Sequence, residues 1–207
     1  PLPRERNPTR IWKRMKRMNS HKKGAVFVVS GPSGVGKDTV LKELMPRLGD
    51  RAVMSVSNTT RPPRSGEVDG VDYNFIGEDE FRRAIAEGKM LEYTEYCSVL
   101  YGTPLDPIKK WVDDGKAVIL KIEREGMLNV RKRMPEAVTV FIAPPSEEVL
   151  EKRIRGRQSE TSAAIEKRLD RARYEMKMSG DYDHRIVNDG LEEAVNELEK
   201  LILKYIG

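Results

Sequence analysis

Apolar runs alternate with amphipathic stretches along most of this chain. Several apolar runs have the length and composition of buried strands, at 25–30, 117–122, 137–142 and 185–187. Apolar positions spaced by three or four residues predict helices between and after these strands, at about 37–48, 125–133, 146–179 and 191–205. Buried strands separated by helices are typical of a parallel sheet that carries helices on both faces. The pattern therefore predicts an α/β fold.

The segment from about 56 to 104 breaks this alternation. It is rich in Thr, Tyr, Gly and Asp, and one helix is predicted in it, at about 78–87. Short extended runs lie at 73–76 and 90–93. We interpret this segment as a small mixed α+β insertion in the core.

The composition is that of a charge-rich globular protein. The chain has 207 residues, of which 38% are hydrophobic and 34% are charged, enough for one domain with a substantial core. No apolar stretch reaches the roughly 18 residues that cross a bilayer, so we expect no membrane association. Cys97 is the single cysteine, which favours a reducing compartment. We therefore expect a cytoplasmic location.

The first 23 residues carry much of the net charge of +5. They contain three prolines, many lysines and arginines, and one acid, so we expect them to be disordered or loosely attached and exclude them from the fold. A tag remnant, an alternative start and the remainder of an organelle transit peptide all fit this composition. A nucleic-acid-binding arm is a further alternative, although we expect no nucleic-acid partner.

The most informative segment follows the first predicted strand and has the pattern of a phosphate-binding loop. Its residues are Gly31, Pro32, Ser33, Gly34, Val35, Gly36, Lys37, Asp38 and Thr39. Glycines let the backbone turn its N–H groups inward, and the positive end of the following helix adds to their attraction for phosphate. Lys37 supplies a full charge near the outer phosphates. We predict that this loop binds ATP; a chance glycine-rich turn is the alternative.

Asp38 departs from this pattern. The residue after the loop lysine is usually a Ser or Thr whose hydroxyl helps to hold Mg²⁺. An acid beside polyphosphate is repelled unless it turns away or contacts the metal. We expect Thr39, one place later, to take the metal-side role, with Mg²⁺ as the cofactor that accompanies ATP.

A second motif lies in the insertion, at 57–73, and places Arg61 and Arg64 on either side of two prolines. It is followed by Glu92 between a leucine and a tyrosine, and then by Tyr101 and Thr103. On these motifs the chain resembles the guanylate kinase family over residues 24–205. The phosphate loop alone would indicate only the wider class of P-loop proteins. The resemblance implies transfer of the γ-phosphoryl group of ATP to GMP.

The chemistry of the second motif agrees with this resemblance. Two guanidinium groups on a stiff loop can grip one phosphate, and tyrosine hydroxyls can donate to it. The resemblance implies that Arg61, Arg64, Tyr73 and Tyr101 bind the phosphate of GMP. A solvated pair of surface arginines is the alternative.

Glu92 lies in an otherwise apolar and aromatic run. By resemblance, its carboxylate accepts hydrogen bonds from N1–H and the 2-amino group of guanine, and Ser57 and Thr103 complete the recognition of the base. Adenine lacks these donors. Charged hydrogen bonds are worth roughly 1.5–3 kcal/mol each, so two can discriminate by several powers of ten. An ordinary surface acid is the alternative.

The strand at 117–122 is expected to lie beside the strand of the phosphate loop. The family carries two acids, two residues apart, at the end of this strand. Here Lys121 replaces the first, so Glu123 is the candidate acidic contact to GMP or to the shell of the metal. Arg124 and Glu125 also differ from the family sequence.

A cationic helix–loop–helix segment at 148–170 resembles the lid that closes over ATP in this family. Arg153, Arg157 and Arg168 match the lid positions that contact ATP and the transferring group, while Gln158 stands where glycine is usual. A solvated helical face with ion pairs is the alternative. Further along the chain, Asn188 matches a position near the adenine.

Together these features predict a P-loop kinase: a parallel-sheet core at 24–55, 105–147 and 171–207, a GMP-binding insertion at 56–104, and the helical lid. The predicted partners are ATP, ADP, GMP and GDP, with no obligate protein partner. Catalysis would depend on positioning and charge neutralisation. The residues expected to supply it are Lys37, Arg61, Arg153, Arg157 and Arg168.

Three other functions stay open at this point. A peptide-binding scaffold domain of the same fold would have no need of the phosphate loop. A kinase for another small phosphorylated acceptor would have no need of Glu92. A nucleic-acid-stimulated NTPase is supported by the basic amino-terminal segment alone.

Overall fold

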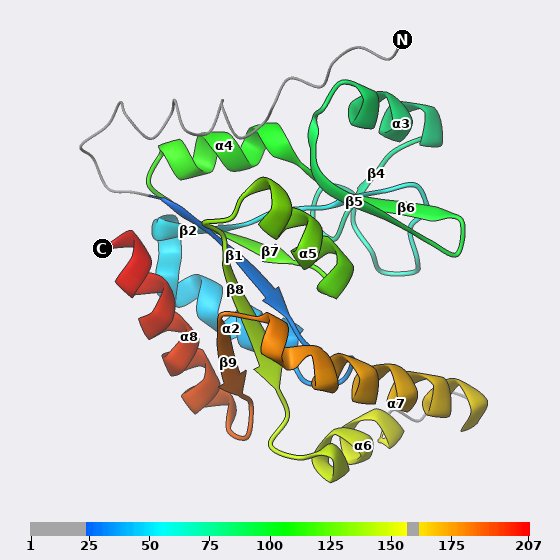
Figure 1. Cartoon of the computed structure of the whole chain (residues 1–207), viewed down its shortest axis with the longest axis vertical. Coiled ribbons are helices and arrows are strands. Elements are labelled where there is room, and N and C mark those ends of the chain that lie inside the picture. The colour runs from blue at the N-terminus through cyan, green and yellow to red at the C-terminus, as the bar shows by residue number, and fades with distance from the viewer. Residues whose placement is uncertain (1–23, 157–161) are drawn as a thin grey trace.

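The computed structural model describes residues 24–156 and 162–207, and a five-stranded parallel sheet lies at its centre (Figure 1). Its order is β2-β7-β1-β8-β9, with parallel pairing throughout. Because all five strands run the same way, their carboxyl ends meet at one edge, where ligands bind in such sheets. The strands are β1 (Ala25–Ser30), β2 (Ala52–Met54), β7 (Ala117–Lys121), β8 (Val138–Ala143) and β9 (His184–Val187).

Helices cover both faces of this sheet. α2 (Lys37–Leu48) and α8 (Leu191–Ile206) lie on one face, and α4 (Leu105–Asp113) and α5 (Arg124–Arg133) lie on the other (Figure 1). Side chains of β1 alternate between the faces: Phe27 and Val29 join the α2 and α8 cluster, whereas Val26 and Val28 join that of α4 and α5. The predicted α/β fold is confirmed.

The insertion forms a second sheet in the order β4-β3-β6-β5. β3 pairs in parallel with β4 and antiparallel with β6, so the sheet is mixed, as predicted. Phe81 is buried with Met90 and Leu100 in a small core of its own. The elements are β3 (Asn58–Thr59), β4 (Asn74–Phe75), α3 (Glu78–Ala86), β5 (Met90–Tyr96) and β6 (Val99–Pro104).

The helical pattern predicted at 146–179 divides into α6 (Glu147–Arg155) and α7 (Ser162–Lys177), followed by the 3₁₀ turn η2 (Met178–Asp181). Ser146 caps the amino end of α6, where its hydroxyl accepts a hydrogen bond from the Val149 N–H at 3.3 Å. The helix ends before Gly156, because glycine weakens a helix. Arg157 and Gln158 lie outside the described residues.

The sequence analysis does not identify β2 or α4. β2 has only three residues, too few for an alternation pattern, and the 3₁₀ turn η1 (Gly49–Arg51) joins it to α2. In α4 the apolar residues Leu105, Ile108 and Trp111 are spaced by three, but the prolines at 104 and 107 suggest a loop. Pro107 lies in the first turn of α4, where its missing N–H breaks no helical hydrogen bond.

Two further expectations concern the surroundings of the core. None of the helices in the described ranges combines the length and the hydrophobicity of a membrane span. The expected disorder of residues 1–23 concerns a segment outside the part of the chain that the structure describes.

We predict that Leu198→Ala lowers the free energy of unfolding by about 2–5 kcal/mol. Leu198 of α8 is fully buried in the cluster that includes Phe27 and Leu44, so truncation leaves a cavity against the central strand. Urea titration followed by circular dichroism measures the change. Leu191→Ala, at the more exposed start of the same helix, is the control and should cost less than about 1 kcal/mol. Equal losses would contradict this account of α8.

Candidate functional site

The phosphate loop leaves the carboxyl end of β1 and runs into α2. Gly31, Gly34 and Gly36 have φ angles of 150°, 86° and 94°, which residues with a side chain rarely adopt. A Cβ atom at Gly31 would lie 2.2 Å from the carbonyl oxygen of Ile142 in β8. The loop therefore passes directly against the neighbouring strand, and glycine is the residue that permits this approach.

Polar contacts hold the loop from behind. The buried side-chain amide of Asn188 donates to the Val35 carbonyl at 2.8 Å. Arg153 of α6 donates to the Asn188 carbonyl through both terminal nitrogens, each at 3.1 Å. The Val35 side chain is fully buried in the main core. Asn188 and Arg153 thus stabilise the loop, a role that the sequence analysis does not predict.

Lys37 begins α2 and turns its ammonium back into the loop. The ammonium donates to the carbonyl oxygens of Gly31 and Pro32, the second at 3.4 Å. Burial lowers the pKa of Lys37 from its usual value, and nearby carboxylates partly oppose this effect. An anionic ligand in the loop would favour the charged form.

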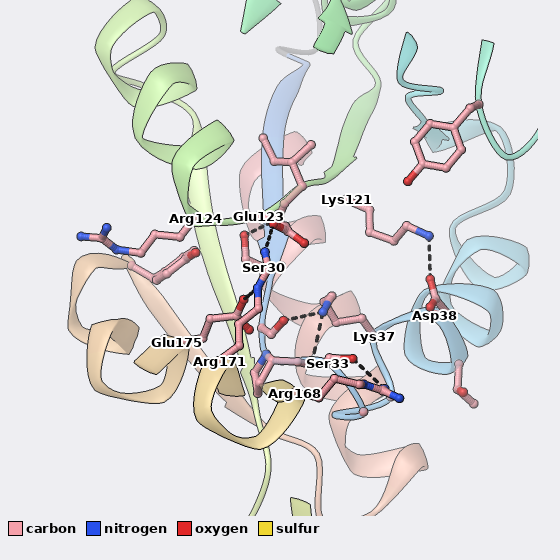
Figure 2. Close-up of a pocket in the computed structure, with 18 residues that line it drawn as sticks. Ser30, Ser33, Lys37, Asp38, Lys121, Glu123, Arg124, Arg168, Arg171 and Glu175 are labelled. Carbon is pink, nitrogen blue, oxygen red and sulfur yellow. Dashed lines mark hydrogen bonds and ion pairs between the residues drawn. The ribbon is translucent and has the colours of Figure 1, made fainter. Parts of the chain in front are cut away.

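A cavity of about 380 Å³ opens in front of the loop. Figure 2 shows Lys37 and Arg168 beside the loop, Lys121 meeting Asp38 on one side, and Arg171 with Glu175 on the other. Cationic side chains outnumber carboxylates in the lining, so the cavity favours an anion. Its ionisable residues are Lys37, Asp38, Tyr73, Lys121, Glu123, Arg124, Arg168, Arg171, Glu175 and Tyr182.

Charged residues of α7 connect this helix to the core. Arg171 forms an ion pair with Glu123, just after β7, and donates to Glu175 at 3.1 Å. Burial raises the pKa of Glu175. Arg168, about one turn earlier, donates to the Ser33 hydroxyl of the phosphate loop at 2.8 Å. The helix therefore contacts the loop and the end of β7 at the same time.

On the other side of the cavity, Lys121 forms an ion pair with Asp38 at 2.6 Å between Nζ and Oδ1. Lys121 is the last residue of β7, and Asp38 lies in the first turn of α2. Two of the residues that depart from the expected pattern are therefore in contact. Thr39, next to Asp38, is exposed and lines the same cavity.

Arg61 lies at the centre of a second cluster, in the insertion. Its two terminal nitrogens donate to the Glu67 carboxylate at 2.6 and 2.7 Å, and the Arg64 N–H donates to the same carboxylate at 2.8 Å. These bonds lower the pKa of Glu67 to about 2. The Arg61 guanidinium lies 5.0 Å from the Tyr73 ring centroid. Among the described residues, the buried Arg61 Nε has no hydrogen-bond partner.

Glu92 is a buried carboxylate at the junction of the insertion and the core. Its side chain is on β5, the residue is 5% exposed, and the Thr103 hydroxyl donates to it at 2.5 Å. A Cβ atom at Gly126 of α5 would lie 3.0 Å from its Oε2. Burial raises the pKa of Glu92, while the hydrogen bond from Thr103 acts in the opposite direction. Such a group favours a ligand that donates hydrogen bonds to it.

The structure brings most of the predicted ATP-binding residues together. The predicted residues that line the cavity are Gly31, Pro32, Ser33, Gly34, Gly36, Lys37, Asp38, Thr39, Tyr73, Glu123 and Arg168. The side chains of Val35, Arg153 and Asn188 lie behind the loop. The other predicted GMP-binding residues lie in the insertion, outside this lining: Ser57, Arg61, Arg64, Glu92, Tyr101 and Thr103.

Arg171, Glu175 and Glu67 are site residues that the sequence analysis does not assign. Arg171 and Glu175 follow Arg168 by three and seven residues, a spacing that places all three on one helical face. From this spacing, Arg171 and Glu175 could have been identified as neighbours of Arg168 at the site. For Glu67, six residues after Arg61 in an irregular loop, spacing gives no such signal.

Comparisons with known proteins agree with this arrangement. A family profile described as guanylate kinase matches residues 23–205. The guanylate kinase of Synechocystis sp. is 45% identical over 180 residues, which is 87% of this chain and 94% of the relative. That of Bacillus subtilis is 44% identical over 181 residues, covering 87% and 89% of the two chains. A crystal structure of guanylate kinase from Anaplasma phagocytophilum is similar, with a TM-score of 0.72, 32% identity, and coverage of 89% and 87%.

We predict that Glu92→Gln stabilises the ligand-free protein at neutral pH. Because burial raises the pKa of Glu92, the folded protein binds this proton more tightly than the unfolded chain does. Stability is therefore lost as the pH rises from the usual glutamate pKa through the raised one. Glutamine keeps an acceptor for Thr103 and carries no charge, which removes that loss.

Urea unfolding between about pH 5 and pH 8 measures this effect. The advantage of the variant over the parent protein should grow with pH. Glu95→Gln, at an exposed position of the same strand, is the matched control and should follow the parent. The same pH dependence in both variants would contradict a desolvated Glu92.

Proposed function

The chain belongs to the guanylate kinase family, and we propose that it transfers the γ-phosphoryl group of ATP to GMP, forming ADP and GDP in purine nucleotide metabolism. The observation that carries this proposal is a pair of cationic clusters, around Lys37 and around Arg61, that Tyr73 connects. Tyr73 lines the cavity of the phosphate loop and also packs against Arg61. The single cysteine favours the reducing cytoplasm as the location.

ATP is assigned to the phosphate loop. The inward N–H groups, the first turn of α2 and the Lys37 ammonium attract its phosphates. Arg168 already contacts Ser33, so a small movement of α7 brings its guanidinium to the outer phosphate. Arg153 and Arg157 belong to the same proposed lid. Asn188, which holds the loop, is also proposed to lie near the adenine.

GMP is assigned to the insertion. Arg61 has an unpartnered buried Nε and a fork that Glu67 occupies, so its donors are arranged for an anion. The phosphate of GMP is proposed to replace the Glu67 carboxylate there, with Arg64, Tyr73 and Tyr101 as further donors. The guanine is proposed to lie against Glu92, with Ser57 and Thr103 beside it, while Glu123 faces GMP or the metal shell.

The residues of the cavity fit a Mg²⁺ ion that is bound mainly by nucleotide phosphates. In the described part of the chain, no group of three or more His, Cys, Asp or Glu side chains is placed to hold a metal ion by itself. Mg²⁺ commonly uses one or two protein oxygens together with phosphates. Thr39 lines the cavity and would supply such an oxygen. When bound, the ion would neutralise phosphate charge.

The reaction needs no general base, because the acceptor oxygen of GMP is already ionised. Lys37 and Arg168 are proposed to neutralise the charge that spreads over the transferring oxygens, while Arg61 and Arg64 hold the acceptor in line. Water in the cavity would compete as an acceptor. We propose that α7 and the insertion close over both nucleotides and exclude it.

We predict that Lys37→Met and Arg61→Met each lower kcat by about 10²–10³-fold, since each removes a positioned charge from a phosphate. A coupled assay of ADP release measures kcat, and circular dichroism checks that the variants are folded. Lys200→Met, at an exposed position of α8, removes one positive charge elsewhere and should leave the rate unchanged. Near-normal turnover in either test variant would reject its assigned role.

ADP release with GMP, AMP, UMP or no acceptor tests the acceptor itself. We expect GMP to be preferred by several powers of ten, and Glu92→Gln to narrow the ratio of GMP to AMP rates by about tenfold or more. Equal release without an acceptor would identify an NTPase. Faster release with AMP or UMP would identify a different kinase. If no ADP is released with any acceptor, the alternative of a peptide-binding domain without kinase activity would be favoured.

A further inference from the structure

The ion pair between Asp38 and Lys121 lies on one side of the cavity, at two positions whose residue types are unusual for a phosphate-loop protein (Figure 2). P-loop proteins usually place a hydroxyl after the loop lysine and an acid at the end of a neighbouring strand. Here the acid follows the loop lysine, and a cation ends β7. The usual hydroxyl and acid together carry one negative charge, whereas Asp38 and Lys121 together are neutral. The net charge of this wall of the cavity is therefore more positive by one.

The register of β7 places Lys121 on the same side of the sheet as the phosphate loop. In the parallel pairing of β7 with β1, Lys121 lies beside Val29, the penultimate residue of β1. Side chains alternate along a strand, and Ala117 and Ile119 pack in the cluster that contains α2. Lys121, two residues after Ile119, is therefore on the α2 face. The amino end of α2 is where the loop directs its phosphates.

Stability does not account for this pair. The side chains of Lys121 and Asp38 are 44% and 81% exposed. Pairs this exposed contribute about 0.2–1 kcal/mol to folding. Both residues, however, line the cavity that favours an anion. Their position at the cavity, rather than a contribution to the fold, is what distinguishes them.

We propose that Lys121 is a further phosphate-binding residue of the ATP site, and that Asp38 positions its ammonium before the nucleotide arrives. The identity of the nucleotide rests on the proposed function. The flexible lysine stem lets the ammonium move from the carboxylate to a phosphate oxygen without movement of β7. Asp38 is exposed enough to remain hydrated when Lys121 moves, so this exchange leaves no buried carboxylate.

A double-mutant cycle on ATP binding tests which of two roles Lys121 has. Lys121 either contacts a phosphate directly or only neutralises the charge of Asp38. Calorimetry with ATP, first in EDTA and then with Mg²⁺, is carried out on the wild type, Asp38→Asn, Lys121→Met and the double variant. We expect Lys121→Met to weaken ATP binding about tenfold or more, because it removes a charged hydrogen bond and leaves Asp38 beside the phosphates.

The double variant provides the decisive comparison. It should bind ATP about fivefold or more weakly than Asp38→Asn alone, because the lost ammonium contacts phosphate directly. Equal affinity in these two proteins would overturn the proposal, since Lys121 would then serve only to neutralise Asp38. Lys200→Met corrects for the change in net charge and should bind ATP like the wild type.

ATP binding needs no GMP, so the two proposals fail separately. A wild type that binds ATP but forms no GDP rejects the proposed kinase activity and leaves the Lys121 cycle interpretable. If the wild type forms GDP but Asp38→Asn and the double variant bind ATP equally well, only the proposed role of Lys121 is rejected. A wild type that binds no ATP rejects both.

Discussion

The close approach of Gly31 to the Ile142 carbonyl is the constraint on which the site depends. A side chain at Gly31 would push the phosphate loop away from β8. The loop would then lose the buried contact from Asn188 to Val35, and with it the placement of the first turn of α2. Lys37, Asp38 and Thr39 all take their positions from that turn. The packing of one backbone segment against another thus sets the geometry of the cavity in front of the phosphate loop.

The two proposed pockets hold their cations in different ways before any nucleotide binds. In the insertion, Glu67 occupies the Arg61 fork and so fixes the orientation of the guanidinium. In the loop, Lys37 is held by backbone carbonyl dipoles and is desolvated. In the first case an incoming phosphate would have to displace a carboxylate, and in the second it would compete with two carbonyl oxygens for the ammonium. Orientation is gained in both at the cost of some affinity.

Much of this architecture could be predicted from the sequence because the signals are local. The strand, glycine loop and helix at 25–48 are adjacent in the chain, and their polar pattern specifies each element. The mixed insertion was recognisable by the loss of that pattern. The motif resemblance likewise identified Arg61 and Glu92 as candidates, since their neighbours in sequence are distinctive.

The contacts that complete the site could not be predicted in this way. Lys121 and Asp38 are 83 residues apart, and Arg171 and Glu123 are 48 apart. One sequence carries no measure of such distances, so Lys121 looked like an isolated exception. The hydrogen bond from Asn188 to Val35 is similar, because the two residues are 153 positions apart in the sequence and meet only in the folded chain. Strand register and helix packing, rather than residue type, decide these pairings.

The Asp38–Lys121 contact also makes the two positions interdependent under substitution. Removal of the lysine alone would leave the Asp38 carboxylate without this ion pair, in a cavity that favours anions. Removal of the aspartate alone would leave one more cation in a lining that already holds several. An engineered replacement of both residues should therefore change position 38 before position 121.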